Sequence, residues 1–211
     1  MMNCWSAADV WVFRWVNEGC ACPALDWVLG FVGGTGAMHW LLVTLAVLLV
    51  TLGGFKGRVY VLLAVLCVAI GDPLVVNSIK RTAGRARPYA ALEQVRRVSW
   101  QDGAPRVRWV SKETRKANSM PSAHVANSTA LALAAALVFG WRRWRWLLLW
   151  PLLMMVSRVY TGDHFPADTV AGFLLGGGYT LIICRAADKV WRNYGRRLTP
   201  QLYDKHSTLL A

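Results

Sequence analysis

The sequence contains few charged residues and few carboxylates. Charged residues make up 17% of the 211 residues, and Asp and Glu together number 11. The apolar residues form long blocks instead of the short periodic pieces of a water-soluble core, which argues against an ordinary soluble domain. The carboxylates are scattered, without the cluster that a two-metal hydrolytic site uses. We therefore expect no metal, no other cofactor and no nucleic-acid partner.

The five cysteines lack a zinc-type pairing, and the N-terminus lacks the pattern of a signal peptide. Cys20 and Cys22 are one residue apart, a spacing that fits neither a zinc knuckle nor a redox pair. A disulfide from Cys4 to one of them stays open if these residues face an oxidising space. The N-terminus lacks a basic start and a clean apolar core, so we expect no cleavable leader.

Long, nearly uncharged blocks are the main feature that is present. Each is close to the ~20 residues that cross a bilayer, or reaches that length with flanking residues or tilt. They predict an all-α membrane bundle in one domain, residues 1–211, with about five to six transmembrane helices. The sixth candidate, residues 25–37, is interrupted by glycines and is placed at the interface. The five principal blocks are residues 38–53, 59–79, 122–140, 146–157 and 168–184.

The N-terminal segment, residues 1–37, has its own pattern. Polar residues fall on one face of a helix and tryptophans lie elsewhere, which predicts an amphipathic helix in the headgroup layer. A terminal helix packed on the bundle is an equally good interpretation. The 12 tryptophans of the chain suit interfacial belts in either case. The polar residues are Ser6, Asp9, Arg14 and Asn17.

The orientation depends on the loop at residues 80–121. Alternating crossings place this loop on the same side as the turn at residues 158–167, and Lys and Arg are shared evenly between the two faces. The short loops of the opposite face carry basic but no acidic residues, which favours that face, with the basic tail at residues 186–211, as cytoplasmic. We therefore expect a multi-pass inner-membrane protein whose large loop faces the extracytoplasmic side.

Two alternating stretches in this loop, residues 95–110, surround Asp102 and Gly103 and predict a β-hairpin. The hairpin either covers a headgroup or is a solvated decoration. Arg81, Arg85 and the hairpin arginines are expected to face solvent or headgroups.

Three clusters at predicted helix ends indicate an anion site on this face. Lys80, Arg87 and Arg158 supply fixed positive charge, and guanidinium groups bind phosphate in a bidentate manner. Pro121 and Ser122 begin a predicted helix, whose N-terminus favours an anion. Together these residues predict a phosphate site at headgroup depth.

Two histidines are available for chemistry at that site. His164 lies four residues before Asp168. The carboxylate can therefore orient the ring and leave the second nitrogen free to attack phosphorus. His124 is placed to protonate the leaving group as general acid.

Further residues are given lesser roles. Asp72, inside a predicted crossing, lies two helical turns from Lys80 and is a candidate for tuning the site, because an acid at that depth normally has a partner. Gly172 and Gly176, four residues apart, are expected to permit close helix packing.

These residues resemble the signature of the type 2 phosphatidic acid phosphatase superfamily: K-x6-RP, then PSGH, then SR-x5-H-x3-D. The chain matches with Lys80-Arg87-Pro88, with residues 121–124, and with Ser157, Arg158, His164 and Asp168. Ala123 stands where the family pattern has Gly. Its N–H group still serves as a phosphate ligand unless the position requires φ above zero.

The resemblance implies a metal-independent lipid phosphatase that forms a phosphohistidine on His164, with His124 as acid and Asp168 as orienting group. The phosphate ligands would be Lys80, Arg87, Ser122, Ala123 and Arg158. Undecaprenyl diphosphate is slightly preferred as substrate over lipid A, phosphatidylglycerol phosphate and phosphatidate. A lipid phosphotransferase and a non-enzymatic binder of anionic lipids remain alternatives, and the oligomeric state is open.

Overall fold

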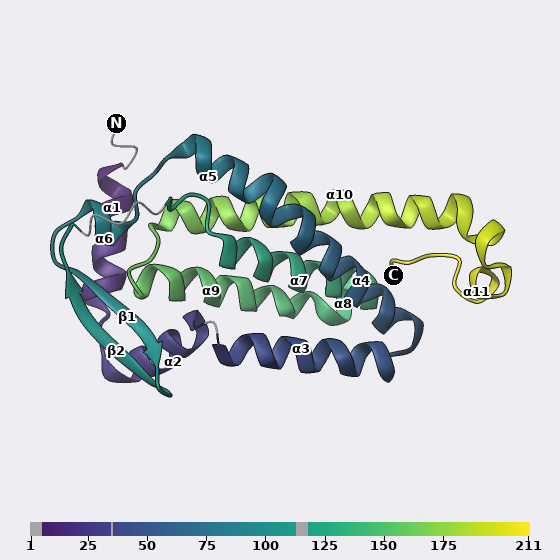
Figure 1. Ribbon diagram of the computed structural model, residues 1–211, viewed down its shortest axis with the longest axis horizontal. Helices are drawn as coiled ribbons and strands as arrows, with labels where there is room; N and C mark the ends of the chain where they lie inside the picture. Colours follow the sequence, from purple (N-terminus) through teal and green to yellow (C-terminus); the bar gives the residue numbers. More distant parts are fainter. Residues whose placement is uncertain (1–5, 35, 113–117) are drawn as a thin grey trace.

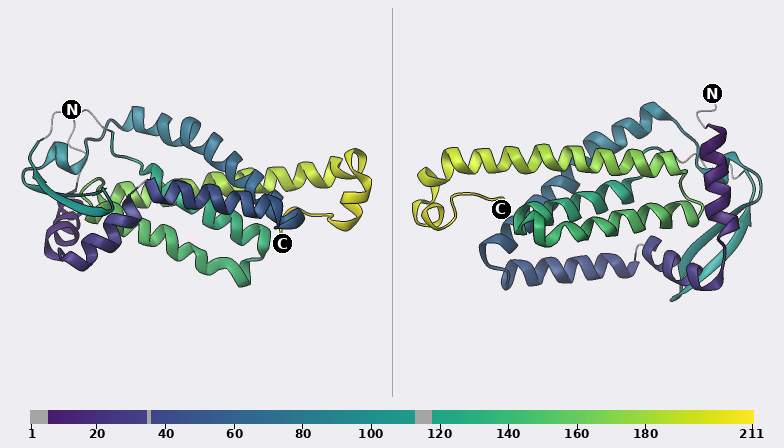
Figure 2. Two further views of the ribbon diagram at one scale, coloured as in Figure 1. Left: turned by 60° about the horizontal axis from the view of Figure 1, so that its bottom comes forward. Right: turned by 180° about the vertical axis from the view of Figure 1, so that it is seen from behind.

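The computed structural model describes residues 6–34, 36–112 and 118–211, and it is predominantly helical. Long helices lie side by side, and a two-stranded hairpin with short helices covers one end (Figures 1 and 2). This arrangement confirms the predicted helical bundle with a β-hairpin. The proposed bridge to Cys4 falls outside the described residues.

The helices of the bundle coincide with the apolar blocks of the sequence. The connection from α7 to α9 is made by α8 (Trp141–Trp144) and a 3-10 turn (Arg145–Leu148). The long segments are α3 (Gly36–Thr51), α4 (Gly54–Ile70) continued by a π-helical segment (Gly71–Val76) and α5 (Asn77–Ala83), α7 (Ala123–Phe139), α9 (Leu149–Tyr160) and α10 (Pro166–Leu198).

Two of these helices are long and apolar enough to cross a membrane. They are the continuous helix Gly54–Ala83, of 30 residues, and α10, of 33 residues. Large apolar side chains point outward along both, with Leu74 67% and Ile182 71% exposed. A surface of this kind suits a bilayer, because in water it would leave extended apolar area unburied. The number of crossings stays a prediction, since α3 and α7 are shorter.

Helices α7 and α10 pack closely at two glycines. A Cβ atom built on Gly172 would lie 2.5 Å from the carbonyl oxygen of Ser122, and one on Gly176 would lie 2.4 Å from that of Ala126. No larger side chain fits at these distances, which supports the close packing predicted from their spacing. The contact also holds the N-terminus of α7 beside the first turns of α10.

The N-terminal helices cover the hairpin end of the bundle. They are α1 (Ala7–Arg14), a π-helical turn (Trp15–Gly19) and α2 (Pro23–Gly33). Asp9 of α1 and Asn17 of the π-helical turn point into the protein and are buried, while Trp11 is 67% exposed. The interpretation of a terminal helix packed on the bundle therefore describes this segment, with tryptophan outward. The prediction that the polar face meets headgroups is wrong for Asp9 and Asn17, because both find hydrogen-bond partners inside.

The hairpin consists of β1 (Val95–Gln101) and β2 (Ala104–Val110), which pair antiparallel after the short helix α6 (Pro88–Ala91). The turn residues Asp102 and Gly103 both have positive φ, as predicted for this sequence. Arg96 on β1 is buried and donates through Nη2 to both carboxylate oxygens of Asp26 on α2, at 2.6 and 2.5 Å. This ion pair ties the hairpin to the bundle, so the expectation that the hairpin arginines face solvent is wrong for Arg96.

The C-terminal residues fold back on the far end of the bundle, where α11 (Pro200–Lys205) follows α10 (Figure 1). The backbone N–H of Leu209 donates to Asp188 at 2.7 Å, and that of Ala211 donates to the carbonyl of Leu137 at 2.8 Å. Leu209 is buried in the main apolar core. The segment predicted as a basic tail is therefore largely helical and held against the bundle.

Candidate functional site

The turn between α9 and α10 brings together three of the predicted site residues, Arg158, His164 and Asp168. Arg158 lies in the last turn of α9, and its carbonyl oxygen accepts from the N–H groups of Asp163 and His164 at 3.2 and 3.1 Å. Gly162 has φ +81°, and a Cβ atom there would lie 2.7 Å from the carbonyl oxygen of Arg96. Glycine is therefore required at this point of the turn.

Asp168 is the centre of a buried hydrogen-bond network. As the third residue of α10 it accepts from the N–H of Phe165 at 2.8 Å, the arrangement of a capping box. It also accepts from the hydroxyl of Ser119. Arg85 donates to its other oxygen at 2.6 Å. The carboxylate is 0% exposed, so these donors hold it in one orientation.

His164 lies beside this network and is 1% exposed. Its Nδ1 is 3.3 Å from the hydroxyl oxygen of Ser119 and 3.7 Å from a carboxylate oxygen of Asp168. Burial, opposed by Asp168 and aided by the charges of Arg158 and Arg87, lowers the pKa of His164 to about 4. The ring is therefore neutral at pH 7, with its Nδ1 edge turned toward Ser119 and Asp168.

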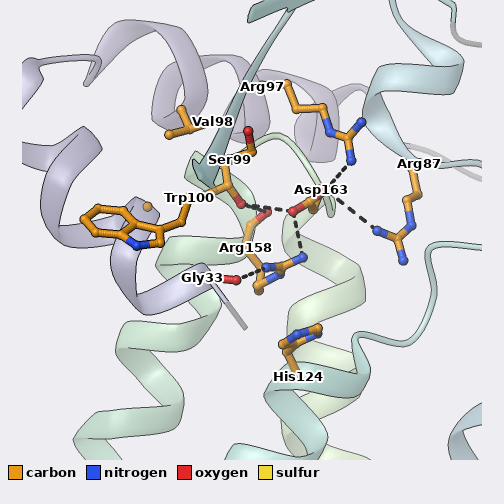
Figure 3. Close-up of a pocket in the computed structure, with 12 residues that line it drawn as sticks. Gly33, Arg87, Arg97, Val98, Ser99, Trp100, His124, Arg158 and Asp163 are labelled. Atoms are coloured by element: carbon orange, nitrogen blue, oxygen red, sulfur yellow. Dashed lines mark hydrogen bonds and ion pairs between the residues drawn. The ribbon is translucent and has the colours of Figure 1, made fainter. Parts of the chain in front are cut away.

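A cavity of 270 Å³ adjoins this turn and is lined by positively charged groups (Figure 3). Arg87, Arg97 and Arg158 reach it from three elements, and His124 at the start of α7 forms part of its wall. His164 is not part of the wall, whereas its neighbour Asp163 is.

Several donors at the site have no partner among the described residues. They are Nε of Arg87, Nε of Arg158 and the hydroxyl of Ser122, all of them buried atoms. Buried donors of this kind are normally satisfied, and an anion that brings several acceptor oxygens would satisfy them together. The predicted phosphate ligands Arg87, Ser122 and Arg158 thus share one property, a buried donor without a protein acceptor.

Lys80, Asp72 and Ala123 complete the predicted set. Lys80 is half-buried in α5 and interacts electrostatically with Arg87, Asp72 and Arg158. Ala123 is the first residue of α7, and its φ is not positive. The replacement of the family glycine by alanine therefore carries no backbone strain at this position.

Comparison with known proteins agrees with the motifs and the fold. The family model of the PAP2 superfamily, the type 2 phosphatidic acid phosphatase superfamily named above, matches residues 58–192. The chain belongs to the PAP2 superfamily.

Two relatives and one solved structure illustrate this membership. The lipid A 4'-phosphatase of Bacteroides thetaiotaomicron is 29% identical over 150 residues, which is 68% of this chain and 62% of that protein. The sphingosine-1-phosphate phosphatase 1 of Rattus norvegicus is 37% identical over 73 residues, 31% of this chain and 16% of that protein. The crystal structure of Aquifex aeolicus LpxE shares the fold, with a TM-score of 0.64 and 23% identity over 88% of this chain and 99% of that one.

The structure adds residues to the site that the sequence motifs did not indicate. Arg85 was expected to face solvent, but it is 5% exposed, because Asp168 and Asp9 both accept hydrogen bonds from it. Arg97, expected outside, is half-buried and lines the cavity. Ser119 joins His164 to Asp168. Asp163 lies directly before His164 in the sequence, and this position next to a predicted nucleophile was the only signal.

Proposed function

We propose that this PAP2 superfamily protein is a metal-independent phosphatase of membrane lipid phosphates. The observation that carries the proposal is the pairing of a neutral, buried His164 with an adjacent cationic cavity, together with three buried donors that lack an acceptor among the described residues: Nε of Arg87, Nε of Arg158 and the hydroxyl of Ser122. A phosphate ester supplies the missing acceptor oxygens, and the neutral imidazole supplies a lone pair.

The proposed first step forms a phosphohistidine. Nε2 of His164 attacks phosphorus while Asp168 and Ser119 hold the Nδ1 edge. Arg87, Arg158, Lys80, Ser122 and the N–H of Ala123 bind the non-bridging oxygens. The P–O bond to the lipid breaks, and His124 protonates the leaving oxygen. The negative charge of the phosphate raises the proton affinity of His124 and so favours this role.

The second step releases phosphate. A water molecule, deprotonated by His124, attacks phosphorus and the P–N bond breaks, which returns His164 to its neutral form. Asp72 interacts electrostatically with Lys80, and we propose that it adjusts the position of the Lys80 ammonium group.

The proposed lipid substrates rest on the apolar outer surface of the bundle and on the relatives of the chain. The apolar outer surfaces of the long helices support a bilayer location, and we propose an inner-membrane protein with the hairpin end on the extracytoplasmic side. The extent of the match to the lipid A 4'-phosphatase puts lipid A first among the substrates to test. Undecaprenyl diphosphate, the substrate slightly preferred from the sequence, comes next, followed by phosphatidylglycerol phosphate and phosphatidate.

The experiment measures inorganic phosphate released from each lipid by the purified protein in the presence of EDTA. We expect release from at least one lipid and its loss in His164→Ala, with His206→Ala, at the opposite end of the bundle, as the control. A strict requirement for divalent metal would contradict the mechanism. Transfer of labelled phosphate into a second lipid instead of water would identify a phosphotransferase. Unchanged function of both His124 and His164 variants would indicate a non-enzymatic lipid binder.

A further inference from the structure

Asp163 lies in the wall of the cationic cavity, among its three arginines. One carboxylate oxygen accepts from Nη2 of Arg158 at 2.6 Å, and the other lies 3.7 Å from Nη1 of Arg87 and 3.6 Å from Nη2 of Arg97 (Figure 3). Three guanidinium groups from three different elements therefore converge on one carboxylate. This is the coordination that a phosphate group would be given in a site of this type.

The carboxylate is ionised at neutral pH. Burial would raise the pKa of Asp163, but the charges of Arg158, Arg87 and Arg97 act against it and leave this pKa below its usual range. Asp163 thus neutralises part of the positive charge that the arginines would otherwise present to a bound anion.

The contacts of Asp163 with the three arginines differ in length, and this difference favours replacement of the carboxylate by a phosphate. The pair with Arg158 has hydrogen-bond length, whereas the pairs with Arg87 and Arg97 are too long for good hydrogen bonds. Arg87 and Arg97 are also partly accessible, with side chains 21% and 27% exposed. An incoming phosphate can take these two arginines without first breaking a short contact.

The burial of the nucleophile, His164, also supports displacement of Asp163 by a phosphate. His164 is 1% exposed and is not part of the cavity wall, yet it follows Asp163 directly in the turn. A phosphate in the cavity can reach the imidazole only if the part of the wall beside His164 moves. Asp163 is the wall residue next to His164.

We propose that Asp163 is a specificity-determining residue, an internal anion that screens Arg87, Arg97 and Arg158 and must be displaced by the phosphate of the substrate. This inference rests on the proposed function. Free inorganic phosphate has only its charge with which to displace the carboxylate, whereas a lipid phosphate adds contacts of its headgroup and chains. Asp163 therefore weakens the binding of free phosphate, including the product, more than that of the lipid substrate.

The test compares inhibition by inorganic phosphate in the wild type and in Asp163→Asn, using the best lipid substrate of the panel. Close charge pairs in a partly desolvated site have large coupling energies, so we expect the inhibition constant for phosphate to fall about tenfold or more in the variant. We also expect the preference for the lipid over p-nitrophenyl phosphate, as a ratio of kcat/KM values, to decrease.

Two control variants separate this role from a structural one. Asp163→Glu keeps the negative charge and makes only a small change in geometry. The inhibition constant for phosphate should therefore stay within about threefold of the wild-type value. Asp102→Asn removes one negative charge from the hairpin tip, where the side chain is 86% exposed, and should not change it. A merely structural role of Asp163 would lower stability and activity without tightening phosphate binding.

The outcomes are distinct from those of the proposed function. A wild type that releases no phosphate from any lipid contradicts the proposed function itself. An active wild type with an unchanged or higher inhibition constant in Asp163→Asn overturns only the role of Asp163. If Asp163→Asn is not recovered folded, Asp163→Ser removes the same charge and is judged by the same criterion.

Discussion

Arg85 joins the N-terminal helix to the carboxylate beside His164. Its Nη1 donates to Asp168 at 2.6 Å, and its Nη2 donates to Asp9 of α1. The second oxygen of Asp9 accepts from the N–H of Ala167 at 2.9 Å, so the chain of contacts closes on the first turn of α10. The position of Asp168 therefore depends on Arg85 and on Asp9, which is near the N-terminus and far from Asp168 in the sequence.

Replacement of Arg85 should affect stability and catalysis together. Arg85→Met leaves Asp9 and Asp168 buried without their cation, and we expect the free energy of unfolding to fall by about 3–5 kcal/mol. Activity should fall as well, and Arg85→Lys should restore part of it. Thermal unfolding in detergent and phosphate release measure the two effects. Arg81→Met, at an exposed position near the end of α5 and four residues before Arg85, is the matched control, and an equal loss in that variant would contradict the role of Arg85.

The pH dependence should reflect the low proton affinity of His164. Its pKa is lowered to about 4 mainly by burial, so the folded protein binds a proton there more weakly than an ordinary histidine. The nucleophile therefore stays neutral as the pH falls through 6.5. On the acidic side, kcat/KM should begin to decrease only near pH 4 to 5. The histidine also favours the folded state above pH 6.5, and this contribution is lost as pH falls from 6.5 towards 4. An acidic limb in kcat/KM near pH 6.5 would contradict this assignment.

Ser119 should act on the chemical step and less on binding. Its hydroxyl donates to Asp168 and lies 3.3 Å from Nδ1 of His164, and it is 0% exposed. Loss of one such hydrogen bond typically costs about 1 kcal/mol, which corresponds to a reduction in kcat of roughly fivefold to tenfold in Ser119→Ala. Steady-state kinetics should show KM nearly unchanged. Ser111→Ala, at the exposed end of β2, is the control, and a change confined to KM would argue against an orienting role.

The orientation in the membrane can be tested with single cysteines. Asp102→Cys at the hairpin tip, with Cys4, Cys20 and Cys22 replaced by Ser, should react with a membrane-impermeant maleimide in intact spheroplasts. Arg143→Cys, on an exposed turn between α7 and α9, should react only after permeabilisation. The reverse labelling pattern would place the hairpin end in the cytoplasm.

The sequence pattern was sufficient to predict the helices of the bundle and the hairpin. Long uncharged blocks predicted the helices of the bundle, because an apolar run of this length needs internally satisfied backbone hydrogen bonds. Asp102-Gly103 predicted the hairpin turn, because both residues tolerate positive φ. The fixed spacing of Lys80 and Arg87, and of His164 and Asp168, was enough to indicate the family that the comparison then confirmed.

What a single sequence could not indicate was which charged side chains are buried. Arg81 and Arg85 are four residues apart in the same basic loop, yet Arg81 is exposed and Arg85 is buried. The difference arises because Asp9, far away in the chain, supplies a carboxylate at the right place. Burial of a charge depends on a partner that only the folded chain brings near.

The sequence by itself thus determined the helical bundle, the hairpin and the identities of the residues predicted to handle phosphate, because each follows from local periodicity or fixed spacing. Only the tertiary structure decided that Asp163 lies among Arg87, Arg97 and Arg158, and that Asp9, Arg85 and Asp168 form one buried chain of contacts. Apart from the local pair Arg158–Asp163, these contacts join residues that are far apart in the chain, and their geometry is set by the packing of separate helices and a hairpin.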